Sequence, residues 1–350
     1  MSMRAAPSPA RLPGLDILRL LGALWLFHLV FFAGWAAPDP TLMQGSGTAA
    51  RLAARAAGVL ATSGVAGLEL LLTVSGFLAF RDVRAGRAGS FAARFLRLAA
   101  PLAVLAVAYA AYSGGPFGAA LGQALLLRSP YSTPLLEQAV GGVNPFLAFL
   151  PLAWAWAIAC GRFPRAAGWP ALAALWAACA GLALAGPAGL TPNVHLTAFC
   201  WGALAARISQ DTAWTARVPA WAGPFCFLAA VALCHKLSAL KGADPAYLIA
   251  GRDLPALAQA TALQALCALA VLCSLKPGTA PAWLRPLTLA GSATYGFFIA
   301  WTHWSGPLAA GIIGPDAPLP PRYLAVLGVS LFVALALRPC LDRLPRRPIP

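Results

Sequence analysis

The sequence predicts an all-α, polytopic membrane protein with about ten transmembrane helices and both termini in the cytoplasm. Hydrophobic residues make up 60% of the 350-residue chain, charged residues make up 10%, and the mean hydropathy is +0.74. Soluble globular proteins carry about 25% charged residues. The net charge of +15 comes from basic residues in short clusters between apolar runs, which membrane topology explains better than a basic groove for nucleic acid.

Ten segments are long and apolar enough to be helices that cross the bilayer, which requires about 20 mainly apolar residues. They lie at 14–36, 56–80, 92–112, 143–160, 169–186, 193–208, 219–237, 255–275, 287–306 and 322–339. The piece 117–127 is too short to cross, so with the loop to residue 142 it is expected to be interfacial or re-entrant. Residues 1–350 are therefore expected to form a single membrane domain, and the first segment to be retained rather than cleaved.

The distribution of lysine and arginine predicts the orientation of these segments. With both termini inside, 17 of the 25 basic residues fall on the inner side and 7 on the outer side, and Arg19 lies within the first segment. Because cytoplasmic loops carry the excess of basic residues, this asymmetry favours ten spans. The chain is therefore expected to be a multi-pass membrane protein with its more basic loops in the cytoplasm.

The cysteines are interpreted as small buried residues. There are eight, at positions 160, 179, 200, 226, 234, 267, 273 and 340, mostly inside apolar segments and without a C-x-x-C pair. This pattern predicts neither a metal site nor a disulfide framework.

Four ionisable residues are expected at membrane depth, where their cost makes them candidates for function. At 1.5 Å per residue, His28 lies about 21 Å above the inner edge of the first segment, and His303 in the ninth segment lies at a similar height. Glu69 is expected near the middle of the second segment, and Arg19 near the inner end of the first. A helix-to-helix hydrogen bond is the alternative for the histidines, and a counter-charge for Arg19 is the alternative for Glu69.

The first inner loop is strongly basic. Arg81, Arg84, Arg87, Arg94 and Arg97 lie within 17 residues of one another. The positive-inside rule explains several of them. Arg94 and Arg97 differ, because they run into the third segment one helical turn apart, where two guanidinium groups are suited to phosphate oxygens.

Four short motifs resemble those of the acyltransferase-3 family of integral membrane O-acyltransferases, and they occur in the family's order. Residues 14–19 read GLDILR and precede an apolar run to His28, and residues 67–78 read GLELLLTVSGFL. Residues 94–97 read RFLR and precede Pro101, and residues 294–299 read TYGFFI before His303 and Trp304. The resemblance covers most of the chain, and the ten predicted segments agree with it.

The resemblance implies an enzyme that moves an acyl group, often acetyl from cytoplasmic acetyl-CoA, to a hydroxyl of a glycan or a lipid-linked acceptor. His28 then activates the hydroxyl as a general base, supported by Glu69. Arg19, Arg81, Arg94 and Arg97 are the candidates for binding acyl-CoA. Tyr295, His303 and Ser75 form a second candidate group. Acyl-CoA is the donor substrate, and no permanently bound cofactor or metal is implied.

The spacing between Arg19 and His28 departs from the family pattern. Ten residues usually separate the two, whereas eight do so here. At 100° per residue, the offset of nine places them on opposite faces of a helix. Arg19 and His28 are therefore expected to act separately, with Arg19 facing the inner side or bracing Asp16.

Two other functions stay open. A proton-coupled secondary transporter or flippase could use Glu69 and His28 as a relay, although the halves of the chain show no internal repeat. A catalytically inactive membrane scaffold is the other alternative, and the shortened Arg19-to-His28 spacing is the feature that supports it.

Overall fold

The computed structural model describes residues 12–33, 47–84, 111, 169–185, 197–210, 219, 222–240, 253–275, 282–294, 310–314 and 319–343. In these ranges the longer elements are helices and no strand is present. The expected all-helical fold is confirmed for this part of the chain. The expected spans at 92–112 and 143–160, and the interfacial segment between them, lie essentially outside it, as do residues 295–306 of the ninth expected span.

The described helices follow most of the expected spans closely. They are α1 (Pro13–Ala33), α2 (Thr48–Ser63), α3 (Val65–Arg84), α8 (Trp169–Ala185), α9 (Thr197–Ile208), α11 (Ala222–Leu240), α13 (Leu254–Cys273), the short 3₁₀ helix η4 (Ala282–Leu284), α14 (Arg285–Ser292) and α17 (Leu319–Arg343). Within the part of the chain that the structure describes, three helical stretches are long and apolar enough to cross a membrane: Gly58–Arg81, Leu254–Cys273 and Pro321–Pro339.

The second expected span is the main difference. The structure divides it into α2 and α3, with a turn at Gly64, and α2 begins at Thr48, eight residues before the expected start at residue 56. The added residues at the start of α2 include Arg51 and Leu52, both exposed. The apolar pattern marked the membrane-like part of this segment, but it did not reveal the more polar helix that precedes it.

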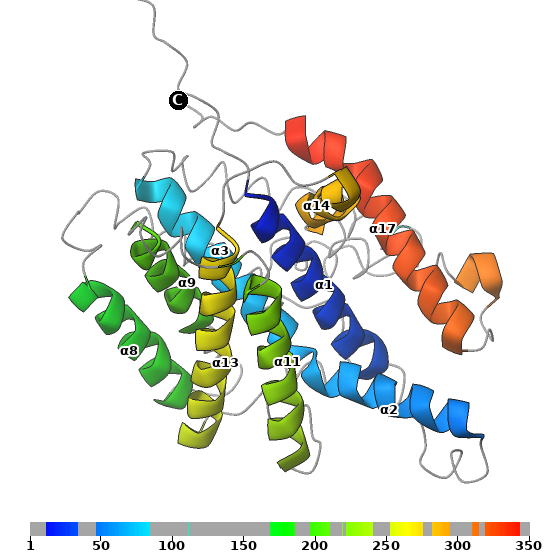
Figure 1. The fold of residues 1–350 in the computed structure, drawn as a ribbon, viewed down its shortest axis with the longest axis horizontal. Helices are drawn as coiled ribbons and strands as arrows, with labels where there is room; N and C mark the ends of the chain where they lie inside the picture. The colour runs from blue at the N-terminus through cyan, green and yellow to red at the C-terminus, as the bar shows by residue number, and fades with distance from the viewer. Residues whose placement is uncertain are drawn as a thin grey trace, which may run out of the picture.

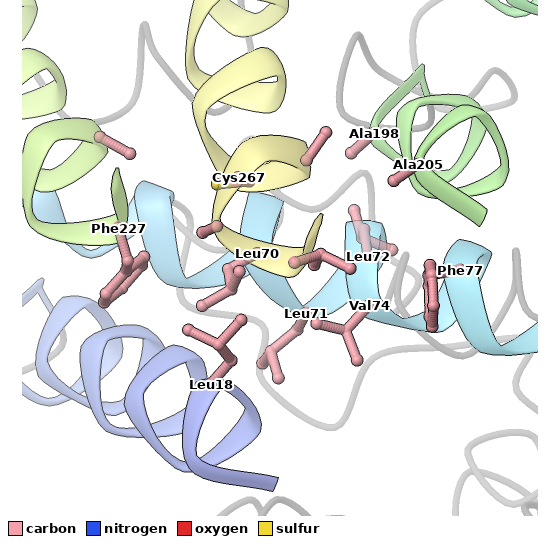
Figure 2. Packing of buried hydrophobic residues seen from close by; sticks show 14 of the residues in the cluster. Leu18, Leu70, Leu71, Leu72, Val74, Phe77, Ala198, Ala205, Phe227 and Cys267 are labelled. Carbon is pink, nitrogen blue, oxygen red and sulfur yellow. The ribbon is translucent and has the colours of Figure 1, made fainter. Parts of the chain in front are cut away.

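Helix α3 is the centre of the described bundle. Figure 1 shows α8, α9, α13 and α11 on one side of α1, and α17 on the other. Figure 2 shows α3 between α1 and the pair α13 and α9, with Leu70 and Leu71 among the side chains buried around it. Leu70 is fully buried, and Phe77 and Phe80 on the same helix are each only 1% exposed.

Glycines allow α3 to approach its neighbours backbone to backbone. A β-carbon on Gly67 would meet the carbonyl oxygen of Gly22 in α1 and would lie 2.7 Å from the amide nitrogen of Leu26. On α3 and α9, Gly76 likewise meets the carbonyl of Phe199, and Gly202 meets that of Thr73. Lipid tails are as apolar as leucine, so the hydrophobic effect does not drive helices together in a membrane. Small residues at the contact instead allow close packing of the helices.

Contacts between helix ends define two ends of the bundle. At the first, which we call the Gly14 end, Gly14 and Gly223 pack against Ser274, and Gly291 packs against the carbonyl of Asp16. At the second, which we call the His28 end, α1 meets the α2–α3 turn and the start of α17, and α2 meets α11. Their hydrogen bonds are Trp25 to Ser63 (3.2 Å), His28 to Tyr323 (2.6 Å) and Thr62 to His235 (3.1 Å). Segments that cross the membrane in alternating directions, as the sequence predicts, would bring these same helix ends together.

The glycine contact predicts a large effect of one methyl group. Gly67→Ala is expected to lower the free energy of unfolding by about 1–3 kcal/mol, because the new carbon meets backbone atoms that cannot move aside. Gly181→Ala in α8 is the matched control, since a β-carbon there meets nothing within 4 Å. Denaturant unfolding of the purified protein in detergent measures both. Equal stability of the two variants would contradict the packing described here.

Candidate functional site

His28 lies near the end of α1 and is 8% exposed. Its Nε2 atom is 2.6 Å from the hydroxyl oxygen of Tyr323 on α17. This is a short hydrogen bond between an imidazole and a phenol, and either group can be its donor, depending on which ring nitrogen carries the proton. The bond joins residues 295 positions apart in the sequence.

Aromatic rings surround this hydrogen bond. The imidazole and the ring of Tyr323 are nearly parallel, at 12° with centroids 5.8 Å apart. Trp25 and Phe27 contact the imidazole edge-on, with centroids at 5.9 and 6.0 Å. Phe27 and Phe31 also contact Tyr323, at 5.7 and 5.3 Å. Three aromatic residues within two turns of α1 therefore hold the imidazole and the phenol in a mainly apolar setting.

The position of Trp25 is set by a separate polar contact. Its indole N–H donates to the hydroxyl oxygen of Ser63 at 3.2 Å, and Ser63 donates to the carbonyl of Val59 at 2.6 Å. Ser63 is fully buried at the end of α2. The turn between α2 and α3 thus orients the tryptophan that packs on His28.

Glu69 lies on another side of α3. Gly67 faces α1, and a residue two positions further along is about 200° around a helix. Glu69 is fully buried, and its carboxyl group is close enough to the thiols of Cys234 on α11 and Cys267 on α13 to interact electrostatically with them. The structure therefore directs Glu69 away from α1, and its catalytic role with His28 stays a prediction.

Arg19 pairs with Asp16, which is one of the two arrangements expected from the sequence. The guanidinium Nη1 donates to the Asp16 carboxylate at 3.4 Å, an i,i+3 contact at the Gly14 end. His28 instead contacts α17, nine residues or about 13.5 Å further along the helix axis. The expectation that Arg19 and His28 have different surroundings is confirmed.

Arg81 lies at the same end as Arg19. Helices α1 and α3 are antiparallel, because Gly22 packs on Leu71 while Leu29 packs on Gly64. Arg81 follows Leu71 by ten residues and is partly buried, so it lies toward the start of α1. The structure thus brings two of the expected acyl-CoA-binding arginines to the Gly14 end.

The other expected site residues divide into two groups. Ser75 donates to the carbonyl of Leu71 in its own helix at 2.8 Å, an arrangement that gives its hydroxyl a structural role. Arg94, Arg97, Tyr295 and His303 lie outside the described residues. Their expected roles stay predictions.

The cysteines are mainly buried thiols. Six lie in the described part of the chain and all six are free, and Cys226 alone of these is only partly buried. The interpretation as small buried residues is confirmed for the other five. Within the same ranges, no group of three or more His, Cys, Asp or Glu side chains is arranged to hold a metal ion.

Comparison with known proteins yields no relative: no family model, curated protein or solved structure matches the chain.

Tyr323 is the site residue that sequence reasoning missed. It follows Pro320, Pro321 and Arg322 at the start of the last expected span. Tyrosines are enriched where helices meet the membrane surface, so its position alone gave no sign of a partner. The available signal was its expected height, because the expected tenth span would begin on the outer side, level with the outer half of the first expected span.

The Ser63 contact gives a test of the site's framework. Ser63→Ala removes the acceptor for the indole N–H of Trp25 and is expected to lower the free energy of unfolding by about 1 kcal/mol. Ser75→Ala is the matched control with an expected change near zero, because its hydroxyl bonds only to its own helix and alanine favours the helix. Denaturant unfolding in detergent compares the two. A Ser63 variant as stable as the parent would remove Trp25 from the framework.

Proposed function

We propose that this protein is a bacterial inner-membrane O-acyltransferase, with ten spans and cytoplasmic termini, that moves an acyl group from acyl-CoA to a hydroxyl. The observation that carries the proposal is the 2.6 Å contact between Nε2 of the buried His28 and a hydroxyl oxygen. A general base must lie about 2.6–3.2 Å from the proton-bearing atom that it serves. This geometry supports a histidine that handles hydroxyl protons inside the bundle.

The chemistry requires a base and a stabiliser of negative charge. An alcohol is a poor nucleophile until its proton is removed, and His28 supplies that function near neutral pH. The thioester oxygen gains negative charge as the alcohol attacks, and an N–H donor or a cation stabilises it. We assign the role of base to His28. The negative charge on the thioester oxygen would be stabilised by polar groups that contact bound acyl-CoA.

The donor enters from the Gly14 end in this proposal, which makes that end cytoplasmic. Arg19 and Arg81 lie there, and Arg94 and Arg97 follow Arg81 closely in the sequence. A guanidinium group can donate two parallel hydrogen bonds to the oxygens of one phosphate. Arginines are therefore suited to bind the phosphates of CoA. His28 is about 13.5 Å beyond Arg19 along the helix axis, so the extended arm of CoA would carry the thioester toward it.

The acceptor approaches from the His28 end, which then faces the outside. The proposed acceptor is a hydroxyl of a glycan or lipid-linked molecule of the cell envelope, and the proposed acyl group is acetyl. Trp25 and Tyr323 lie at this end and offer apolar ring faces beside the imidazole. Such faces suit the CH groups of a sugar ring as well as a lipid.

The position of Glu69 favours a second candidate, a proton-coupled transporter or flippase. A fully buried carboxyl group among α3, α11 and α13 is the kind of residue that marks a proton path in membrane proteins. Proteoliposomes distinguish the two functions. Substrate uptake driven by a pH gradient, without acyl transfer and abolished by Glu69→Gln, would replace the enzyme by the transporter.

The role of His28 can be tested directly. His28→Gln is expected to reduce acyl transfer from labelled acetyl-CoA by about 10²–10⁴-fold, because a glutamine amide cannot accept the proton. The assay uses the purified protein in proteoliposomes with membrane glycan as acceptor, and unfolding in detergent checks that the variant is folded.

His235→Gln is the matched control. His235 lies at the same end of the bundle, and its Nδ1 atom is 3.1 Å from the hydroxyl of Thr62, away from the aromatic cluster. This variant is expected to transfer acyl groups at close to the parent rate. Full activity of a folded His28→Gln protein would refute His28 as the base.

A further inference from the structure

The hydroxyl of Tyr323 occupies the position that a base needs for its substrate. It lies 2.6 Å from Nε2 of His28, so an acceptor hydroxyl can reach that nitrogen directly only if the phenol moves away. His28 is 8% exposed, whereas Tyr323 is partly exposed at the start of α17. The phenol is therefore the more accessible member of the pair.

Displacement of the phenol would be costly. Its ring stacks on the imidazole and contacts Phe27 and Phe31, so rotation away would break three aromatic contacts. Such contacts stabilise the pair beyond the burial of their area. Val326, one turn further along α17, belongs to the same buried cluster as Phe27 and Phe31 and holds this part of the helix against α1.

We propose that Tyr323 stays in place and relays the proton between the acceptor hydroxyl and His28, which makes it a second catalytic residue. This inference rests on the proposed acyltransferase function. In the resting site, Nδ1 of His28 carries the ring proton and Tyr323 donates its O–H to Nε2. The acceptor hydroxyl then donates to the phenol oxygen from the exposed side.

The reaction balances without any further reactant. The acceptor oxygen forms a bond to the thioester carbonyl carbon and gives its proton to the phenol oxygen, and the phenol gives its own proton to Nε2. The carbon–sulfur bond breaks, and the CoA thiolate leaves with the bonding electron pair. The imidazolium returns one proton to that thiolate, so acyl-CoA and alcohol become ester and CoA thiol.

The arrangement explains why a carboxylate is not needed beside His28. A phenol held at hydrogen-bond distance can donate its O–H to Nε2 in the neutral tautomer that carries its proton on Nδ1, which is the form that a base requires. Ring stacking fixes the plane of the imidazole. The phenol thus supplies the orientation that sequence reasoning assigned to Glu69.

Tyr323→Phe is the first test, because it keeps the ring and removes only the O–H group. Transfer of labelled acetyl from acetyl-CoA to membrane glycan in proteoliposomes is expected to fall by about 10²-fold or more. Ser330→Ala is the matched control. It removes a buried hydroxyl from the same helix, one that donates to the carbonyl of Val326 at 2.7 Å, and it is expected to retain parent activity.

Replacement of Tyr323 by 3-fluorotyrosine is the second test and is independent of folding losses in the first. It keeps the ring, the hydroxyl and the stacking but makes the phenol more acidic. A relay predicts that transfer persists with its pH profile shifted to lower pH. A purely structural tyrosine predicts an unchanged profile.

The outcomes separate the two proposals. If the parent transfers acyl groups, requires His28, and loses activity in Tyr323→Phe with a shifted profile in the fluorinated protein, the relay holds. If the parent requires His28 but Tyr323→Phe is within about threefold of it, or the fluorinated profile is unchanged, the relay is overturned while the acyltransferase stands. If the parent transfers no acyl group to any envelope acceptor, the proposed function itself fails.

Discussion

The backbone contact between α1 and α3 is the constraint on which the described site depends. Gly22 and Gly67 allow the two helices to approach so closely that a β-carbon on Gly67 would collide with backbone atoms of α1. This contact sets the rotation of α1 and leaves His28 to one side, against α17. It also turns Glu69 to the far face of α3, toward α11 and α13. Two ionisable residues that were expected to act together are thus directed to different sides of the bundle.

Apolar length predicted the positions of several of the described helices. Helices α8, α13 and α17 begin and end within four residues of the expected limits, because long apolar runs leave few alternatives to a helix. The break at Gly64 and the helix before it were not predicted, since α2 is more polar than a span and apolar length does not detect it. Composition also could not reveal which glycines make contacts, because that depends on partners distant in the sequence.

The candidate site was predicted in part. The depth argument selected His28, and the 100° offset per residue separated it from Arg19, both of which follow from helix geometry alone. Periodicity gives the face of a residue relative to its own helix but not the helix that covers that face. For that reason Glu69 was expected beside His28, and Tyr323, which lies 295 positions away, was not expected there.

The most direct test of the central claim, that this bundle transfers acyl groups to envelope hydroxyls, is mass spectrometry of surface glycans and lipids from cells with and without the gene. The account predicts that one glycan or lipid species loses an acyl mass when the gene is deleted, and that an intact copy restores it. Identical acyl masses in the two strains, with the protein shown to be present in the parent membrane, would contradict it.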